Sequence, residues 1–119
     1  MEHYPQALED FNCAIELNPK LDWAIALRGE TYRLMEHYPQ ALEDFNCAIE
    51  LDPKHAWAIA NRGETYLMLK LYNEALVDLN RAIDLYRFTL KLMHLDKLGK
   101  LGKLGKLGEK EKSFAWLIS

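Results

Sequence analysis

Apolar residues recur along this chain at the spacing of amphipathic helices. Between residues 38 and 51 they follow the three-and-four spacing that places side chains on one side of an α-helix, and the stripe consists of Ala41, Leu42, Phe45, Ala48 and Ile49. Pro39 suits the first turn of this helix, because its missing N–H would have no intrahelical partner there. A second type of helix is predicted from about Asp22 to Met35, and no segment alternates as a strand would.

The chain repeats itself with a period of 34 residues. Residues 1–17 (MEHYPQALEDFNCAIEL) recur without a change at 35–51, and the same offset relates Trp23 to Trp57 and the segment 28–32 to 62–66, which differ only at their last common flanks. A third, more diverged copy covers residues 69–85. A fixed period of this length is typical of a solenoid built from one supersecondary unit.

These patterns together predict an all-α protein, an α-solenoid of antiparallel helical hairpins with five helices. The expected boundaries are a half repeat at 1–17 that holds only a second-type helix, a repeat at 18–51, and a repeat at 52–87 whose last helix extends to about residue 95. Residues 96–119 repeat Leu-Gly-Lys, and leucines at every third position spiral around a helix instead of forming a stripe. We therefore expect a flexible basic tail that is poorly suited to lying on a membrane.

Two glycines stand inside predicted helices, where each costs about 1 kcal/mol relative to alanine. Gly29 and Gly63 are explained if a neighbouring helix crosses at close range. The small residues Ala41 and Ala75 on the second-type helices are positioned to receive that crossing. We therefore expect contact at Gly29/Ala41 and at Gly63/Ala75.

The residues that carry these patterns resemble the tetratricopeptide repeat over about residues 1–85. One copy reads Ile25, Arg28, Gly29, Tyr32, Ala41, Phe45, Ala48 and Pro53, and the next reads Ile59, Arg62, Gly63, Tyr66, Ala75, Leu79 and Ala82. Two departures from the family pattern are isoleucine in place of the usual tryptophan and arginine in place of the usual leucine. We expect Arg28 and Arg62 to pair with Asp44 and Asp78 on the facing helices.

A second stripe on each first-type helix points away from the packing sector. It consists of Trp23, Ala26, Leu27, Glu30, Arg33 and Leu34, followed by Trp57, Ala60, Asn61, Glu64, Leu67 and Met68. The resemblance implies that this face lines a concave groove and meets a peptide of a partner protein. Aromatic anchors of this kind contribute strongly at interfaces. The other interpretation is that each tryptophan packs against the neighbouring unit.

The same positions indicate what kind of peptide the groove would hold. Family members that clamp a C-terminal carboxylate use Lys, Arg and Asn on the groove helices. Here Ala26, Ala60, Glu30 and Glu64 stand at the matching positions, and Asn61 is the one compatible residue. We therefore expect an apolar or basic peptide and no carboxylate clamp.

A second functional hypothesis comes from the first predicted helix, which has no first-type helix before it. Its apolar stripe would be left uncovered, and terminal repeats usually present a polar outer face. The chain would then be a self-associating fragment of a longer array without a separate ligand. Leu8, Phe11 and Ile15 are the candidate contacts for such a homo-oligomer.

Composition and charge argue against other classes of function. The chain carries seven basic and fifteen acidic residues up to Tyr86 and eight basic and three acidic residues from Arg87 onward, for a net charge of −3. A nucleic-acid-binding domain would instead gather basic residues on its folded part. No histidine has a catalytic partner at a recognised spacing, and Cys13 and Cys47 lack a metal-ligand pattern. We expect no enzyme, metal or cofactor, and a cytoplasmic location.

Overall fold

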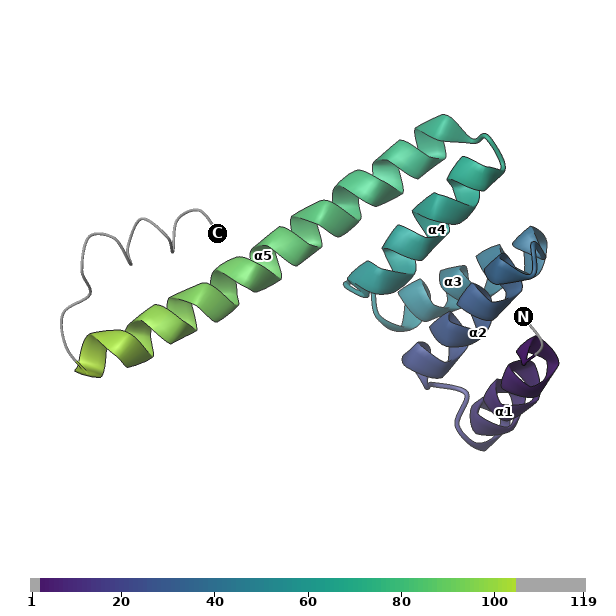
Figure 1. Ribbon diagram of the computed structural model, residues 1–119, viewed down its shortest axis with the longest axis horizontal. Coiled ribbons are helices and arrows are strands. Elements are labelled where there is room, and N and C mark those ends of the chain that lie inside the picture. Colours follow the sequence, from purple (N-terminus) through teal and green to yellow (C-terminus); the bar gives the residue numbers. More distant parts are fainter. Residues whose placement is uncertain (1–2, 105–119) are drawn as a thin grey trace. The chain divides into compact units, whose positions relative to one another are not determined.

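The computed structural model describes residues 3–104 (Figure 1). Within that range the chain forms five helices and no strands, which confirms the all-α solenoid. The helices are α1 (Tyr4–Leu17), α2 (Asp22–Leu34), α3 (Tyr38–Leu51), α4 (Ala56–Met68) and α5 (Tyr72–Leu104). The starts of α2, α3, α4 and α5 are those predicted from the sequence. The chain divides into two units, Met1–Ala82 and Ile83–Ser119, and the helical hairpins belong to the first.

A short turn of one geometry closes each hairpin. After α2, Glu36 adopts a left-handed backbone conformation with φ of 63°. Its N–H donates to the carbonyl of Arg33, and the N–H of His37 donates to the carbonyl of Tyr32. These two bonds satisfy carbonyls that the end of the helix leaves free, as in a Schellman motif. Lys70 repeats the arrangement after α4, with the same φ of 63°, so the two hairpins turn alike.

The turns between hairpins are also copies of each other. The side chains of Asn18 and Asp52 each accept a hydrogen bond at 3.0 Å from the backbone N–H two residues on, at Lys20 and Lys54. Such side-chain turns end one helix and direct the chain toward the next. Because both links have the same geometry, α1 lies against α2 as α3 lies against α4.

The core of the first unit is made mostly of small side chains, which lets the helix backbones approach closely. Its completely or nearly completely buried apolar residues are Ile25, Ala26, Ala41, Phe45, Ala48, Ala58, Ile59, Ala75 and Ala82. Phe45 and Ile59 supply most of the volume. Close packing of this kind makes the core sensitive to added or removed methyl groups.

The predicted partners of the two glycines were wrong by one helical turn. A Cβ atom added to Gly29 would lie 3.0 Å from Cε1 of Phe45 and 3.1 Å from Cβ of Asp44, and one added to Gly63 would lie 3.0 Å from Cγ of Leu79. Ala41 and Ala75 are buried in the same interface but are not the closest residues. In an antiparallel hairpin, residues equally distant from the turn face each other, which pairs Gly29 with the region of residue 44.

The last helix is longer than expected. α5 continues to Leu104, beyond the predicted end near residue 95, so the segment 96–104 is helical and not a flexible tail. Extending an existing helix avoids the cost of nucleation, and leucine and lysine are good helix formers that offset the two glycines of this segment. The rest of the predicted tail, residues 105–119, lies outside the described residues.

Candidate functional site

The predicted groove positions form one surface across the first-type helices. α2 and α4 contact each other near both ends: the rings of Trp23 and Trp57 have centroids 5.6 Å apart, and Nη2 of Arg33 lies 3.7 Å from Oε2 of Glu64. The α2–α4 surface is defined here as the solvent-accessible part of the predicted set, namely Trp23, Leu27, Glu30, Arg33, Leu34, Trp57, Ala60, Glu64, Leu67 and Met68.

Large apolar side chains on this surface are accessible to solvent. Trp23 is 54% exposed, Leu34 48%, Leu67 45% and Met68 58%. The two remaining predicted positions are not accessible: Ala26 is completely buried in the core, and Asn61 is buried with its amide donating to the carbonyl of Trp57. Neither can contact a ligand. Sequence spacing alone did not separate them from the exposed residues of the stripe.

Trp23 packs against the next repeat while keeping half of its surface accessible. Its ring centroid lies 4.2 Å from that of His55, at the start of α4. His55 is buried, and its Nδ1 accepts a hydrogen bond at 3.3 Å from the N–H of Ala58. Its Nε2 lies 3.6 Å from a carboxylate oxygen of Asp22. Sequence reasoning missed this histidine, although its place just before a predicted helix was a signal for a capping residue.

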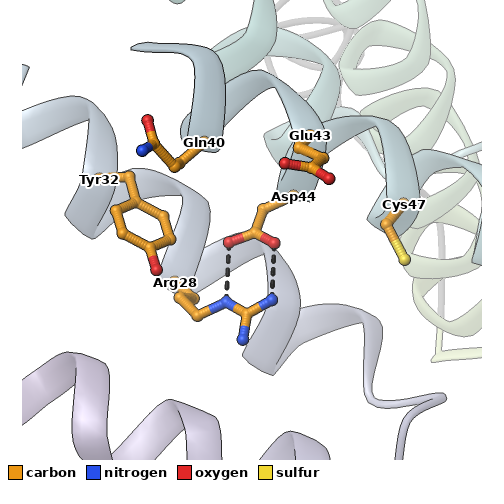
Figure 2. A pocket seen from close by; sticks show the side chains of 6 residues that line it. All are labelled: Arg28, Tyr32, Gln40, Glu43, Asp44 and Cys47. Atoms are coloured by element: carbon orange, nitrogen blue, oxygen red, sulfur yellow. Dashed lines mark hydrogen bonds and ion pairs between the residues drawn. The ribbon is translucent and has the colours of Figure 1, made fainter. Parts of the chain in front are cut away.

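The predicted arginine–aspartate pairs are confirmed in both repeats. Nε and Nη2 of Arg28 each donate at 2.8 Å to the two carboxylate oxygens of Asp44, as Figure 2 shows. Arg62 and Asp78 form the same fork at 2.7 and 2.8 Å. The hydrogen bonds to Asp44 raise the pKa of Arg28 above its ordinary value, so that this side chain stays charged.

Each arginine also reaches back to the preceding helix, which sequence reasoning did not foresee. Nη1 of Arg28 donates to Asn12 of α1 at 2.8 Å, and Nη1 of Arg62 donates to Asn46 of α3 at 2.9 Å. One guanidinium group therefore ties three consecutive helices together. The signal was present in the sequence, because Asn12 and Asn46 recur with the same period as the arginines.

A separate open pocket lies between α2 and α3. Its lining consists of Arg28, Tyr32, Gln40, Glu43, Asp44 and Cys47 (Figure 2). Both oxygens of the Asp44 carboxylate are occupied by Arg28. The pocket shares no residue with the α2–α4 surface, and its ion pair holds helices together.

The candidate self-association residues do not all lie on one face of α1. Ile15 packs against the core cluster, as does Ile49, its equivalent in α3. Leu8 and Phe11 are half-buried. Asp10 is exposed, whereas its equivalent Asp44 is only 6% exposed.

Two searches for other kinds of site gave no candidate. Among the described side chains, no three His, Cys, Asp or Glu residues lie close enough together to hold a metal ion. Over the same part of the chain, no helix combines the length and the apolar character needed to cross a membrane.

Stacked antiparallel hairpins with a 34-residue period define an α-solenoid, and comparison with known proteins gives its family. Tetratricopeptide repeat models match residues 23–55 and residues 46–77. The chain is therefore a tetratricopeptide repeat protein. A search of curated proteins finds no match.

Solved structures of tetratricopeptide repeat proteins have the same fold. The second TPR of Spaghetti (RPAP3), bound to the HSP90 peptide SRMEEVD, is 29% identical with a TM-score of 0.67, and the alignment covers 69% of this chain and 76% of that one. The crystal structure of MamA is 24% identical with a TM-score of 0.70, and the alignment covers 75% of this chain and 52% of that one. The second likeness concerns the fold alone.

Proposed function

We propose that this protein is an interaction scaffold that binds a peptide segment of another protein along the α2–α4 surface. The observation that carries the proposal is the set of large apolar side chains, Trp23, Leu34, Leu67 and Met68, left exposed on two adjoining helices. Exposed aromatic and aliphatic groups rimmed by charges are typical of protein-binding surfaces. The peptide bound to the second TPR of Spaghetti supports the same role for this fold.

The charges of the surface favour a peptide that combines apolar and basic residues. Glu64 is exposed and Glu30 is half-exposed, while the single cation of the surface, Arg33, already lies beside Glu64. The surface therefore carries a net negative charge. The peptide SRMEEVD of the similar structure is acidic, and an acidic ligand would be repelled here.

A carboxylate clamp is disfavoured on this surface for a geometric reason. Asn61 was the one residue of the predicted set suited to that role, and it is buried with its amide committed to the carbonyl of Trp57. A ligand carboxylate would meet Glu30 and Glu64 without a free amide donor from Asn61. We therefore assign recognition to internal side chains of the peptide and not to its C-terminus.

Two fluorescent peptides test the proposal. Both have amidated C-termini and the same leucine and phenylalanine positions, and they differ in carrying arginines or glutamates between them. We expect the arginine peptide to bind about tenfold more tightly by fluorescence anisotropy, and its advantage to shrink as salt is added. Replacing both Glu30 and Glu64 by lysine should reverse the preference.

Trp23→Ala tests the apolar part, and we expect it to weaken binding about tenfold, as for a central aromatic anchor. Val77→Ala is the matched control, because Val77 is exposed on α5 and lies outside the α2–α4 surface. Circular dichroism verifies that each variant remains helical. Equal binding of the two peptides, or an unchanged affinity of the Trp23→Ala variant, would contradict the proposal.

A further inference from the structure

Two helices of this protein have the same sequence but different surroundings. α1 and α3 both read YPQALEDFNCAIEL. α3 lies between two first-type helices, with α2 held by Arg28–Asp44 and α4 held by Asn46–Arg62. α1 contacts α2 through Asn12, which corresponds to Asn46. The side of α1 that corresponds to the α2-facing side of α3 has no helix against it within the described residues.

The uncovered side differs in burial at every corresponding position. We call it the open face of α1. In α3 these residues are buried, and in α1 the apolar ones are half-buried and the aspartate is exposed; the pairs are Ala7 and Ala41, Asp10 and Asp44, Phe11 and Phe45, and Ala14 and Ala48. Because the two sequences are identical, the absence of a neighbouring helix is sufficient to account for the difference.

The covered copy shows what fits the open face. On α3 the space is filled by a helix that presents an aliphatic residue, an arginine, a glycine and an aromatic residue at positions i, i+3, i+4 and i+7, which in α2 are Ile25, Arg28, Gly29 and Tyr32. The glycine lets the backbone approach the phenylalanine ring, and the arginine forks onto the aspartate at 2.8 Å.

We propose that the open face of α1 is a second docking site, which binds one amphipathic helix of this pattern from another polypeptide. The arginine of the incoming helix pairs with Asp10, and its glycine lies over Phe11. This site is independent of the α2–α4 surface and of the function proposed for it. The specificity rests on charge complementarity, because a helix without a cation at this position would leave the aspartate desolvated and unpaired.

A second copy of the chain fits this face less well than a separate helix. Two α1 helices packed face to face would bring the two copies of Asp10 near each other and oppose two Phe11 rings without a glycine between them. The described helices that carry the required pattern, α2 and α4, already use it within each copy, through Arg28–Asp44 and Arg62–Asp78. The docking helix therefore comes from a different sequence.

The full chain and a synthetic helix test this site. The probe is a fluorescent peptide with the sequence of residues 20–35, bridged between positions 23 and 27, on the side of the helix opposite Ile25 and Gly29. The bridge is needed because a helix of this length is marginal in water. We expect the probe to bind the chain, and an Arg28→Asp probe to bind about tenfold more weakly. An Asp10→Arg variant of the chain should reverse that preference.

A blocking variant locates the binding. Residues 18–34 placed directly before Met1 reproduce the sequence of 18–51 and cover the open face with a helix in the same chain. We expect this variant to lose the probe while the unmodified chain keeps it. Three results would overturn the proposal: no binding of either probe, equal binding of both, or binding that persists in the blocked variant. A dimer that Phe11→Asp dissociates, without discrimination between the probes, would instead assign the face to a second copy.

Discussion

The identical helices α1 and α3 allow a stability experiment with an internal control. Asp44→Ala removes the carboxylate that holds Arg28 through two hydrogen bonds of 2.8 Å. Asp10→Ala makes the same change in the same local sequence, where the aspartate is exposed and forms no ion pair among the described residues. Any difference between the two variants therefore measures tertiary contacts and not helix propensity.

The magnitude follows from the exposure of the pair. The side chain of Asp44 is 9% exposed and that of Arg28 is 23% exposed. Breaking a fully buried pair costs about 3–5 kcal/mol, whereas a surface pair contributes about 0–1 kcal/mol, so we expect a loss of about 2–3 kcal/mol. Alanine returns about 0.5 kcal/mol in helix propensity in both variants. The free energy of unfolding should fall by about 2 kcal/mol for Asp44→Ala and stay level or rise slightly for Asp10→Ala.

Urea denaturation followed by circular dichroism measures both variants, and thermal melting should show a fall in Tm of about 10 °C for Asp44→Ala. Adding Arg28→Leu to Asp44→Ala should recover part of the loss, because the unpaired cation is then replaced by an apolar side chain. Equal effects of Asp10→Ala and Asp44→Ala would refute the reasoning, since they would show that the ion pair contributes nothing.

Three further substitutions probe the packing and the helix ends by the same urea denaturation. Phe45→Ala should cost about 3–5 kcal/mol because its ring is completely buried, and Phe11→Ala, in the same sequence context, well under half of that. Gly29→Ala should cost about 1 kcal/mol net, since its Cβ would lie 3.0 Å from the ring of Phe45 and overpacking outweighs the gain in propensity. His55→Ala should cost about 1 kcal/mol through the lost cap of α4, whereas His37→Ala, whose side chain makes no cap hydrogen bond, should cost close to nothing. A reversed order in either matched pair, or a stabilising Gly29→Ala, would contradict the packing described here.

Several predictions from the sequence were correct because they depend on spacing along the chain. The starts of the helices after the first followed from apolar periodicity and from turn residues, which act locally. The pairs Arg28–Asp44 and Arg62–Asp78 were predictable because a short turn fixes which residues of two antiparallel helices face each other. The 34-residue period then carried each conclusion from one repeat to the next.

Burial was decided only by the tertiary structure, because it depends on which elements lie nearby. Ala26 belongs to the same stripe as Trp23, yet it is completely buried while Trp23 is half-exposed beside His55. The difference between Phe11 and Phe45 is the clearest case, since no local rule can distinguish residues in identical segments. The sequence by itself determined the repeat, the helices and their pairing. Only the packing of neighbouring helices determined which of their faces remain available to a partner.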